Sequence, residues 1–175
     1  MAKYLLEGAQ TQRLHFRRFA PEDFDKWLPF FQDPSSTRHW EGIPSDPETA
    51  CREQFHRIFE RYDKDLGGMN ALIHARSGEL LGMCGLLVQD VDGERELEIG
   101  YSLLPNARGQ GYATEAGSFC RDAAFERGWA TSLISIIHTS NEPSMQVAAR
   151  LGMQRRNRTR YRENPVWIYS ISAKK

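Results

Sequence analysis

The alternation of apolar and polar residues along the chain predicts about seven strands and four helices, because strands repeat every two residues and helices every three to four. Strands are expected over residues 13–19, 69–74, 80–88, 97–104, 133–137, 154–161 and 166–172. Helices are expected over residues 21–33, 45–66, 114–127 and 142–150. The segment between the first two helices has no regular period and predicts an irregular connection.

Local signals set the ends of several elements. Ser45 and Glu48 form a capping-box pattern ahead of the second helix. Asn141 suits the N-cap of the last helix. Asn164-Pro165 is a turn signal between the last two strands. Residues 1–10 are expected to be a loosely held terminus.

The order of elements, β-α-α-β-β-β-α-β-α-β-β, predicts an α/β (α+β) fold in which a mixed sheet carries helices on both faces. The length suits a single domain over residues 1–175. A formal net charge of zero gives no argument for nucleic acid or membrane partners, and neither is expected. No signal peptide or membrane span is evident, and three widely separated cysteines argue against a disulfide framework. A cytoplasmic protein is therefore expected, either a monomer or a homodimer.

The stretch of residues 97–114 carries the most chemical information, because a strand leads through a glycine-rich loop into a helix start. Such a loop gathers free backbone N–H groups at the positive end of a helix dipole, which favours a phosphate. The glycines at 109 and 111 fit neither the Walker spacing nor the dinucleotide spacing. A tight turn would explain the glycines but not Arg108, whose guanidinium could reinforce phosphate binding. The loop therefore predicts a pyrophosphate site of another type.

The motif Arg108-x-x-Gly111-x-Ala113 is similar to the acyl-CoA-binding signature of the GNAT superfamily of N-acetyltransferases, and the element order matches that fold. The motifs Glu98-Ile99-Gly100-Tyr101, Asn141-x-x-Ser144 and Leu151-Gly152-Met153 resemble the branch that includes the ribosomal-protein N-terminal alanine or serine acetyltransferases. The resemblance implies a GNAT-like, mostly antiparallel sheet and acetyl-CoA (coenzyme A) as co-substrate. It leaves the acceptor amine open between a protein N-terminus and a small molecule.

The resemblance also implies where acetyl-CoA is held. Two parallel strands splay apart near residues 102–104, where backbone groups would pair with the pantetheine arm and polarise the thioester carbonyl. A plain strand end is the alternative interpretation. Asn141 would touch the arm, and Ser144 would hold its sulfur end or pass a proton to the leaving thiolate, unless it only starts the helix. The expected cofactor contacts are Ser102, Leu103, Leu104, Arg108, Gly109, Gln110, Gly111, Tyr112, Ala113, Thr114, Asn141 and Ser144.

Glu98 is the candidate general base, with a structural carboxylate as the alternative. An acceptor amine has an unperturbed pKa of about 10 and must lose a proton before it attacks. Burial would raise the pKa of Glu98 towards the range of a useful base. Asp90, Asp92, Glu94 and Glu96 extend an alternating acidic pattern that ends at Glu98, and on a strand these side chains would share one face. Such a face would attract a cationic acceptor.

The remaining candidates lie outside this stretch. His39 and Trp40 are expected either to wall the acceptor pocket or, for Trp40, to anchor the irregular connection. Arg155, Arg156, Arg158, Arg160 and Arg162 form a basic cluster. It is interpreted as a solvated charged strand that resists edge pairing, or else as a contact for RNA, an acidic partner or the 3′-phosphate of coenzyme A. No metal site is expected. The alternatives to an enzyme are a non-catalytic acyl-CoA sensor and a binder of ribosome or RNA surfaces.

Overall fold

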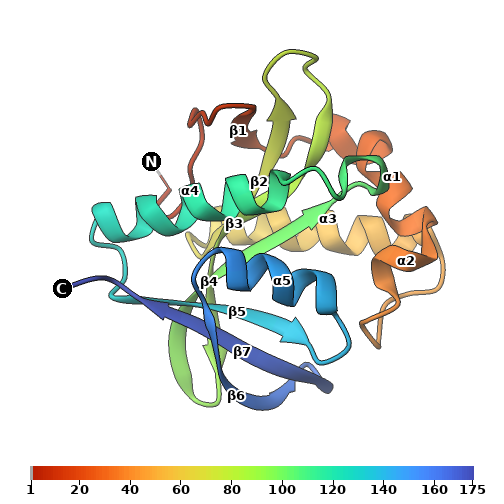
Figure 1. Cartoon of the computed structure of the whole chain (residues 1–175). Helices are drawn as coiled ribbons and strands as arrows, with labels where there is room; N and C mark the ends of the chain where they lie inside the picture. The colour runs from red at the N-terminus through yellow and green to blue at the C-terminus, as the bar shows by residue number, and fades with distance from the viewer. Residues whose placement is uncertain (1) are drawn as a thin grey trace.

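A seven-stranded sheet forms the centre of this computed structural model, which describes residues 2–175 (Figure 1). The strand order is β1-β2-β3-β4-β5-β7-β6, and every neighbouring pair is antiparallel except β4 and β5. This arrangement confirms the expected mixed, mostly antiparallel sheet. The strands are β1 (Leu14–Arg18), β2 (Gly67–His74), β3 (Leu80–Val91), β4 (Glu94–Leu103), β5 (Ser132–His138), β6 (Gln154–Tyr161) and β7 (Asn164–Ser172).

Helices cover both faces of the sheet. In Figure 1, α4 and α5 lie in front of the strands and α3 lies behind them. A short additional helix, α2, occupies part of the connection that was expected to be irregular. The helices are α1 (Phe24–Gln32), α2 (Pro34–Thr37), α3 (Pro47–Asp63), α4 (Tyr112–Glu126) and α5 (Glu142–Arg150), with single 3-10 turns at Pro21–Asp23 and Pro105–Ala107.

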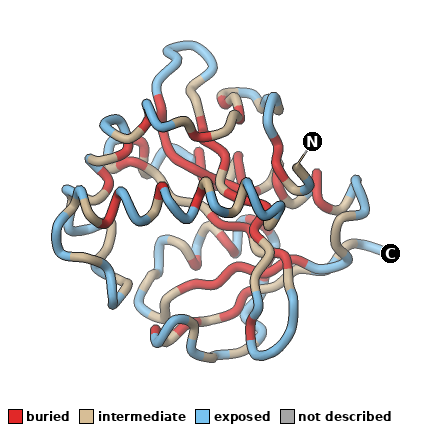
Figure 2. The backbone as a smooth tube through the Cα atoms, turned by 180° about the vertical axis from the view of Figure 1, so that it is seen from behind, coloured by how far each residue is buried: buried red, intermediate tan, exposed pale blue. Residues whose placement is uncertain are grey.

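The alternating strands bury a different apolar layer on each face. In Figure 2 the buried stretches of the chain run through the interior of the molecule. Leu14, Phe16 and Ile99 pack beneath α4 and α5. Trp27 and Phe55 pack on the opposite face with α1 and α3. Each fully buried side chain of this size contributes about 1.5–3 kcal/mol, so the two layers hold the helices firmly against the sheet.

Two sequence expectations about the N-terminal half are wrong in detail. The cap of α3 is Asp46 and not Ser45, because the Asp46 carboxylate accepts the Thr49 N–H at 2.9 Å. The N-terminal segment is also held firmly from residue 2 onward, whereas Met1 lies outside the described residues. Leu6 is only 1% exposed, and its N–H donates to Asn70 Oδ1 at 3.2 Å. Burial of this apolar side chain offsets the entropy of ordering the terminus.

The turn between β6 and β7 also differs from the expectation. Its two central residues are Arg162 and Glu163, with φ of +48° and +64°, whereas Asn164 and Pro165 already belong to β7. The Asn164 side chain explains the shift, because it is buried and binds the backbone of the turn and of the loop after α2. Its Nδ2 donates to the Arg162 carbonyl at 2.9 Å, and its Oδ1 accepts the Glu41 N–H at 2.7 Å.

The parallel pair β4 and β5 separates soon after it forms. Only Glu98 and Ile134 are register partners between these strands, and β5 instead pairs along its whole length with β7. The Ser135 hydroxyl donates to the Ile99 carbonyl at 2.8 Å across the start of the gap. The fold therefore opens a gap in the middle of its own sheet.

Candidate active site

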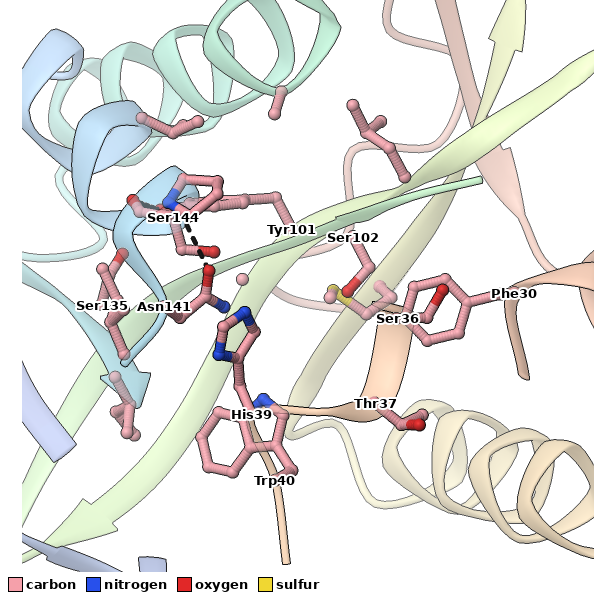
Figure 3. A pocket seen from close by; sticks show the side chains of 18 of the residues that line it. Phe30, Ser36, Thr37, His39, Trp40, Tyr101, Ser102, Ser135, Asn141 and Ser144 are labelled. Carbon is pink, nitrogen blue, oxygen red and sulfur yellow. Dashed lines mark hydrogen bonds between the residues drawn. The ribbon is translucent and has the colours of Figure 1, made fainter. Parts of the chain in front are cut away.

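A cavity of about 1490 Å³ passes through the gap between β4 and β5. It reaches from the N-terminus of α4 on one face of the sheet to α3 on the other. The labelled side chains in Figure 3 come from α1, α2, β4, β5, α5 and the loops beside them, and they surround this common space. All the site residues predicted from sequence line the cavity except Leu104 and Tyr112.

The loop before α4 forms one end of the cavity as a cradle of backbone amides, residues 109–114. Gly109 and Gly111 have φ of +73° and +84°, a left-handed conformation that other residues adopt only with strain. Gly111 is the N-cap of α4 and offers no side-chain cap. Throughout residues 2–175, no acceptor engages the N–H groups of this cradle. The Thr114 hydroxyl oxygen is also buried without a hydrogen-bond partner among those residues.

Arg13 and Glu115 fix the cradle from outside. The Glu115 carboxylate accepts the Arg13 N–H at 2.8 Å and Arg13 Nε at 2.7 Å. Arg13 Nη1 donates to the Gln110 carbonyl at 2.9 Å, and its guanidinium lies over the Tyr112 ring, 4.3 Å from the centroid. The Tyr112 side chain therefore serves this outer contact and not the cavity wall. A preformed, donor-rich loop of this kind suits an anion such as a pyrophosphate.

The Arg108 guanidinium does not point at the cradle. Its Nη1 and Nη2 donate to the hydroxyls of Ser35 and Ser36 at 2.9 and 2.6 Å, and its Nε donates to the Leu103 carbonyl at 3.2 Å. Arg108 thus ties α2 to the end of β4. Any phosphate held here meets the backbone of the loop, and not this side chain.

Of the segment 102–104, only Leu103 directs its backbone into the gap. The Leu104 N–H donates to the Leu81 carbonyl on β3 at 2.9 Å. Because backbone groups alternate in direction along a strand, Ser102 also faces β3 and Leu103 faces away from it. The contact of Arg108 Nε with the Leu103 carbonyl agrees with this direction. The Leu103 N–H is therefore the donor that can meet a group inside the gap.

The start of α5 lies across the gap from Leu103. Asn141 caps the helix, its Oδ1 accepting the Ser144 N–H at 3.2 Å as Figure 3 shows, and both side chains line the cavity. Tyr101 reaches over from β4, and its hydroxyl donates to the Ser144 carbonyl at 2.7 Å. These contacts hold the first turn of α5 at a fixed distance from β4.

Glu98 lies at the other end of the cavity, at the one register pair between β4 and β5. Burial raises the pKa of its carboxyl to about 7, against the opposing effects of a hydrogen bond from Gln89 and the charges of Arg61 and Arg162. A carboxyl with this pKa populates both its protonated and its ionised form near neutral pH, which suits proton transfer at that pH.

Gln89 orients the Glu98 carboxylate, and the sequence analysis did not identify it. Gln89 Nε2 donates to Glu98 Oε2 at 2.8 Å. Its Oε1 accepts Arg61 Nη2 at 2.9 Å and the Tyr161 hydroxyl at 3.0 Å, so two donors fix which way the amide faces. Arg61 is itself anchored by the carbonyls of Leu66 and Val88. The Asp92-Gly93 turn could have pointed to Gln89 from the sequence. A hairpin at this turn pairs Gln89 with Glu96, and Gln89 then lies diagonally across from Glu98.

The chain matches the family described as "Acetyltransferase (GNAT) domain" over residues 13–154. It belongs to the GNAT acetyltransferase family. The N-acetyltransferase p20 of Bacillus licheniformis, itself uncharacterized, is 26% identical over 150 residues, covering 86% of this chain and 84% of p20. These matches make the chain an enzyme of this family.

Solved structures agree with the family assignment. A crystal structure of an acetyltransferase from Agrobacterium tumefaciens str. C58 has a TM-score of 0.78 at 25% identity and covers 94% of each chain. RimL, a ribosomal L7/L12 alpha-N-protein acetyltransferase solved in complex with coenzyme A, shares the fold with a TM-score of 0.73 at 14% identity. That match covers 94% of this chain and 97% of RimL.

In this GNAT enzyme the predicted acidic face is shorter than the sequence pattern. Asp90 belongs to β3 and Asp92 to the turn, because the hairpin reverses the chain between them and Glu94. Glu96 shares the face of Glu98 but is paired with Arg156, at 2.6 Å. Glu98 is therefore the one acid of the series in the cavity wall, and its charged neighbours are arginines.

His39 and Trp40 lie on the cavity wall and connect it to the β5–α5 loop. His39 Nδ1 hydrogen-bonds with the Ser140 hydroxyl at 2.8 Å. The Trp40 ring meets the His138 ring edge to face at 5.9 Å and packs against the apolar cluster of Val91, Ile134, Ile136, Val166 and Ile168. Trp40 is thus both a wall residue and an anchor of the loop after α2.

The arginine-rich strand does not present one basic surface. Arg156 makes a bidentate contact with Glu96. Arg155 stacks on the Trp167 ring at 4.6 Å and donates to the Tyr169 hydroxyl. Arg162 leaves the strand altogether and lines the cavity. This dispersal favours the structural interpretation of β6 over a nucleic-acid surface.

Over residues 2–175, no group of three or more His, Cys, Asp or Glu side chains could hold a metal ion. Helices long and apolar enough to cross a membrane do not occur in that part of the chain.

Proposed function

We propose that this enzyme transfers the acetyl group of acetyl-CoA to the primary amine of a protein N-terminus or a small molecule. The observation that carries the proposal is that one cavity joins two features. A cradle of free amides lies at one end, and a carboxyl with a pKa of about 7 lies at the other. The coenzyme A in the RimL structure and the N-acetyltransferase name of p20 support the same assignment.

The residues present fit acetyl-CoA. The N–H groups of the cradle have no acceptor among residues 2–175 and can donate to a pyrophosphate. The Thr114 hydroxyl, which has no partner among those residues, lies beside them. Leu103, Asn141 and Ser144 line the gap through which a pantetheine arm would run. When bound, acetyl-CoA supplies the activated thioester.

Glu98 would accept a proton from the acceptor ammonium, directly or through a water molecule. The freed nitrogen forms the new N–C bond as the C–S bond breaks. The Leu103 N–H would stabilise the negative charge that develops on the carbonyl oxygen, a role worth about 3–4 kcal/mol for one donor. The departing thiolate would take up one proton, for which the Ser144 hydroxyl in the cavity wall is the candidate donor.

Direct attack is favoured over an acyl-enzyme. Cys51, Cys84 and Cys120 are buried, and none of them lines the cavity. Burial raises the pKa of the Cys51 thiol to about 11, and the pKa of Cys120 is also raised, by its contact with Cys84 and by burial. Thiols in this state are poor nucleophiles.

Thiol release tests the proposal. The protein is incubated with acetyl-CoA and a panel of amines and N-terminal peptides, and the acetylated product is identified by mass spectrometry. We expect amine-dependent release of free thiol. If coenzyme A binds but no amine accelerates thiol release, the chain acts as an acyl-CoA sensor and the proposal is wrong.

Thr114→Val should change cofactor affinity and stability in opposite directions. Valine keeps the shape of the side chain but removes a buried hydroxyl that has no partner, which should raise the free energy of unfolding by about 1 kcal/mol. Loss of the same hydroxyl should weaken coenzyme A binding about tenfold, as measured by titration calorimetry. Thr114→Ser serves as the control and should retain affinity. Unchanged affinity in Thr114→Val would remove this hydroxyl from the binding site.

Gln89→Leu should move the acidic limb of the pH–rate profile to higher pH by about one unit, because the hydrogen bond from Gln89 stabilises the charged form of Glu98. The profile of kcat/KM is measured from pH 5 to 9. Tyr161→Phe, which leaves Arg61 to orient the amide, should move the limb less. A limb at the same pH in Gln89→Leu would show that the contact does not set the pKa of the base.

A further inference from the structure

Three arginines converge on the Glu98 end of the cavity. Arg57 and Arg61 project from α3, and Arg162 comes from the turn between β6 and β7. Arg61 is occupied by Gln89 and by two backbone carbonyls. Arg57 and Arg162 have no ion-pair partner: within residues 2–175, no carboxylate lies within 4.0 Å of either guanidinium. The Arg162 guanidinium lies over the Tyr161 ring, 5.3 Å from its centroid.

The backbone that carries Arg162 is strained. Arg162 and Glu163 both have positive φ in a two-residue hairpin turn, a position that favours Asn and Gly. Non-glycine residues in this conformation persist where the surroundings hold them, and they concentrate at functional sites. Here the buried Asn164 fixes the turn, and it also binds Glu41 from the loop that carries Trp40. The fold thus holds Arg162 over the cavity at a cost in backbone energy.

The positive charges around Glu98 disfavour an acceptor that carries only positive charge. Arg61 and Arg162 both lie close enough to Glu98 to lower its pKa. Partial burial lowers the pKa of Arg57, and the like charge of Arg162 lowers it further. Glu41 and Glu53 also line this side of the cavity, but neither pairs with a guanidinium among the described residues. An ammonium that approaches Glu98 would meet the positive charges of Arg61 and Arg162, which both act on that carboxyl. An acceptor that brought its own negative charge would neutralise them.

We propose that the acceptor of this enzyme carries a carboxylate close to its amine, and that Arg57 and Arg162 bind this carboxylate while the amine meets Glu98. The inference rests on the proposed function and narrows it, because it disfavours polyamines and other purely cationic acceptors. A free amino acid and a peptide with an acidic residue next to its N-terminus both supply this chemistry.

Matched acceptor pairs test the inference by thiol release. The amino acid pairs compare the corresponding primary amides with glycine, β-alanine and γ-aminobutyrate. The peptide pair compares a peptide beginning Ser-Glu with one beginning Ser-Gln. Spermidine represents the polyamines. We expect kcat/KM to favour at least one carboxylate over its amide by about tenfold or more, the usual size of a hydrogen bond to a charged group. The pair with the largest ratio of kcat/KM, carboxylate over amide, shows whether the acceptor is a free amino acid or a peptide.

Arg57→Gln and Arg162→Gln should reduce that preference by raising KM for the carboxylate acceptor more than for its amide. Any change in kcat that follows from the altered charge near Glu98 should be the same for both acceptors. Both side chains are exposed, so the variants should fold, which their Tm values check. Arg52→Gln is the matched control, since Arg52 is exposed on the same helix and does not line the cavity.

Equal rates for every acid and its amide, or spermidine as the best acceptor, would overturn the inference while leaving acetyl transfer intact. Equal losses for both members of a pair in Arg57→Gln and Arg162→Gln would also overturn it. Failure of all amines would instead overturn the proposed function itself.

Discussion

Glu98→Gln is expected to lower kcat/KM by about 10²–10⁴-fold, the range for loss of a positioned general base. Glutamine keeps the size of the side chain and its contact with Gln89 but cannot accept a proton at neutral pH. Because the pKa of Glu98 is raised to about 7, the wild-type rate should fall as the pH drops through that value. This limb should disappear from the profile of the variant, while coenzyme A affinity stays unchanged in titration calorimetry.

The same substitution should increase stability at high pH. The pKa of Glu98 is higher in the folded than in the unfolded chain, where the ordinary value is 4.5. Its contribution to stability is therefore fully present below pH 4.5 and lost as the pH rises through about 7. Glu98→Gln should be more stable than wild type at pH 8 by about 2–3 kcal/mol, and close to wild type at pH 5. Urea unfolding at the two pH values measures this difference.

The two readouts separate the base from a structural carboxylate. If Glu98 only held the fold together, its replacement would lower stability, and activity would fall in proportion to the unfolded fraction. A more stable protein with little activity identifies a group that is kept at a cost in stability for its chemistry. Unchanged turnover across the pH range would remove Glu98 from the mechanism.

Gly111→Val is expected to produce the largest loss of cofactor affinity, at least about tenfold. Gly111 has φ of +84°, and a Cβ there would lie 3.4 Å from Arg13 Nη2. A β-branched residue in this conformation costs about 1–2 kcal/mol or turns the loop away from it. Either result moves the cradle amides from their present positions. Isothermal titration with coenzyme A measures the loss.

Gly128→Val provides the matched control. Gly128 follows the other end of α4 with φ of +65°, and a Cβ there would meet nothing within 4 Å. Both variants should lose a similar free energy of unfolding, but only Gly111→Val should lose coenzyme A affinity. An equal loss of affinity in both variants would mean that the effect comes from general destabilisation of the helix, and not from the cradle.

Much of this site could be predicted because its chemistry is encoded locally. The cradle needs two glycines of positive φ between a strand and a helix, and that pattern is visible in a few consecutive residues. The cap of α5 by Asn141 is a contact over three residues. Glu98 was identified because a carboxylate in a strand beneath helices is desolvated wherever the chain places it.

The partners of Glu98 could not be predicted in the same way. Arg61 and Tyr161 meet Gln89 from positions 28 and 72 residues away, and no periodicity specifies such a meeting. The sequence also grouped Arg162 with the charged strand, whereas the turn residues place it over the cavity. The acidic repeat was misleading for the same reason, because a hairpin separates Asp90 and Asp92 from the face of Glu98.

The sequence by itself determined the order of elements, the amide cradle and the candidate base, since backbone conformation and burial follow from short-range patterns. Only the tertiary structure decided what surrounds that base. The separation of β4 and β5 after one register pair opened the cavity, and α3 and the β6–β7 turn brought arginines to it. Gln89 fixed the orientation of the Glu98 carboxylate. These features depend on side chains that meet across the sheet, where distance along the chain carries no information about distance in space.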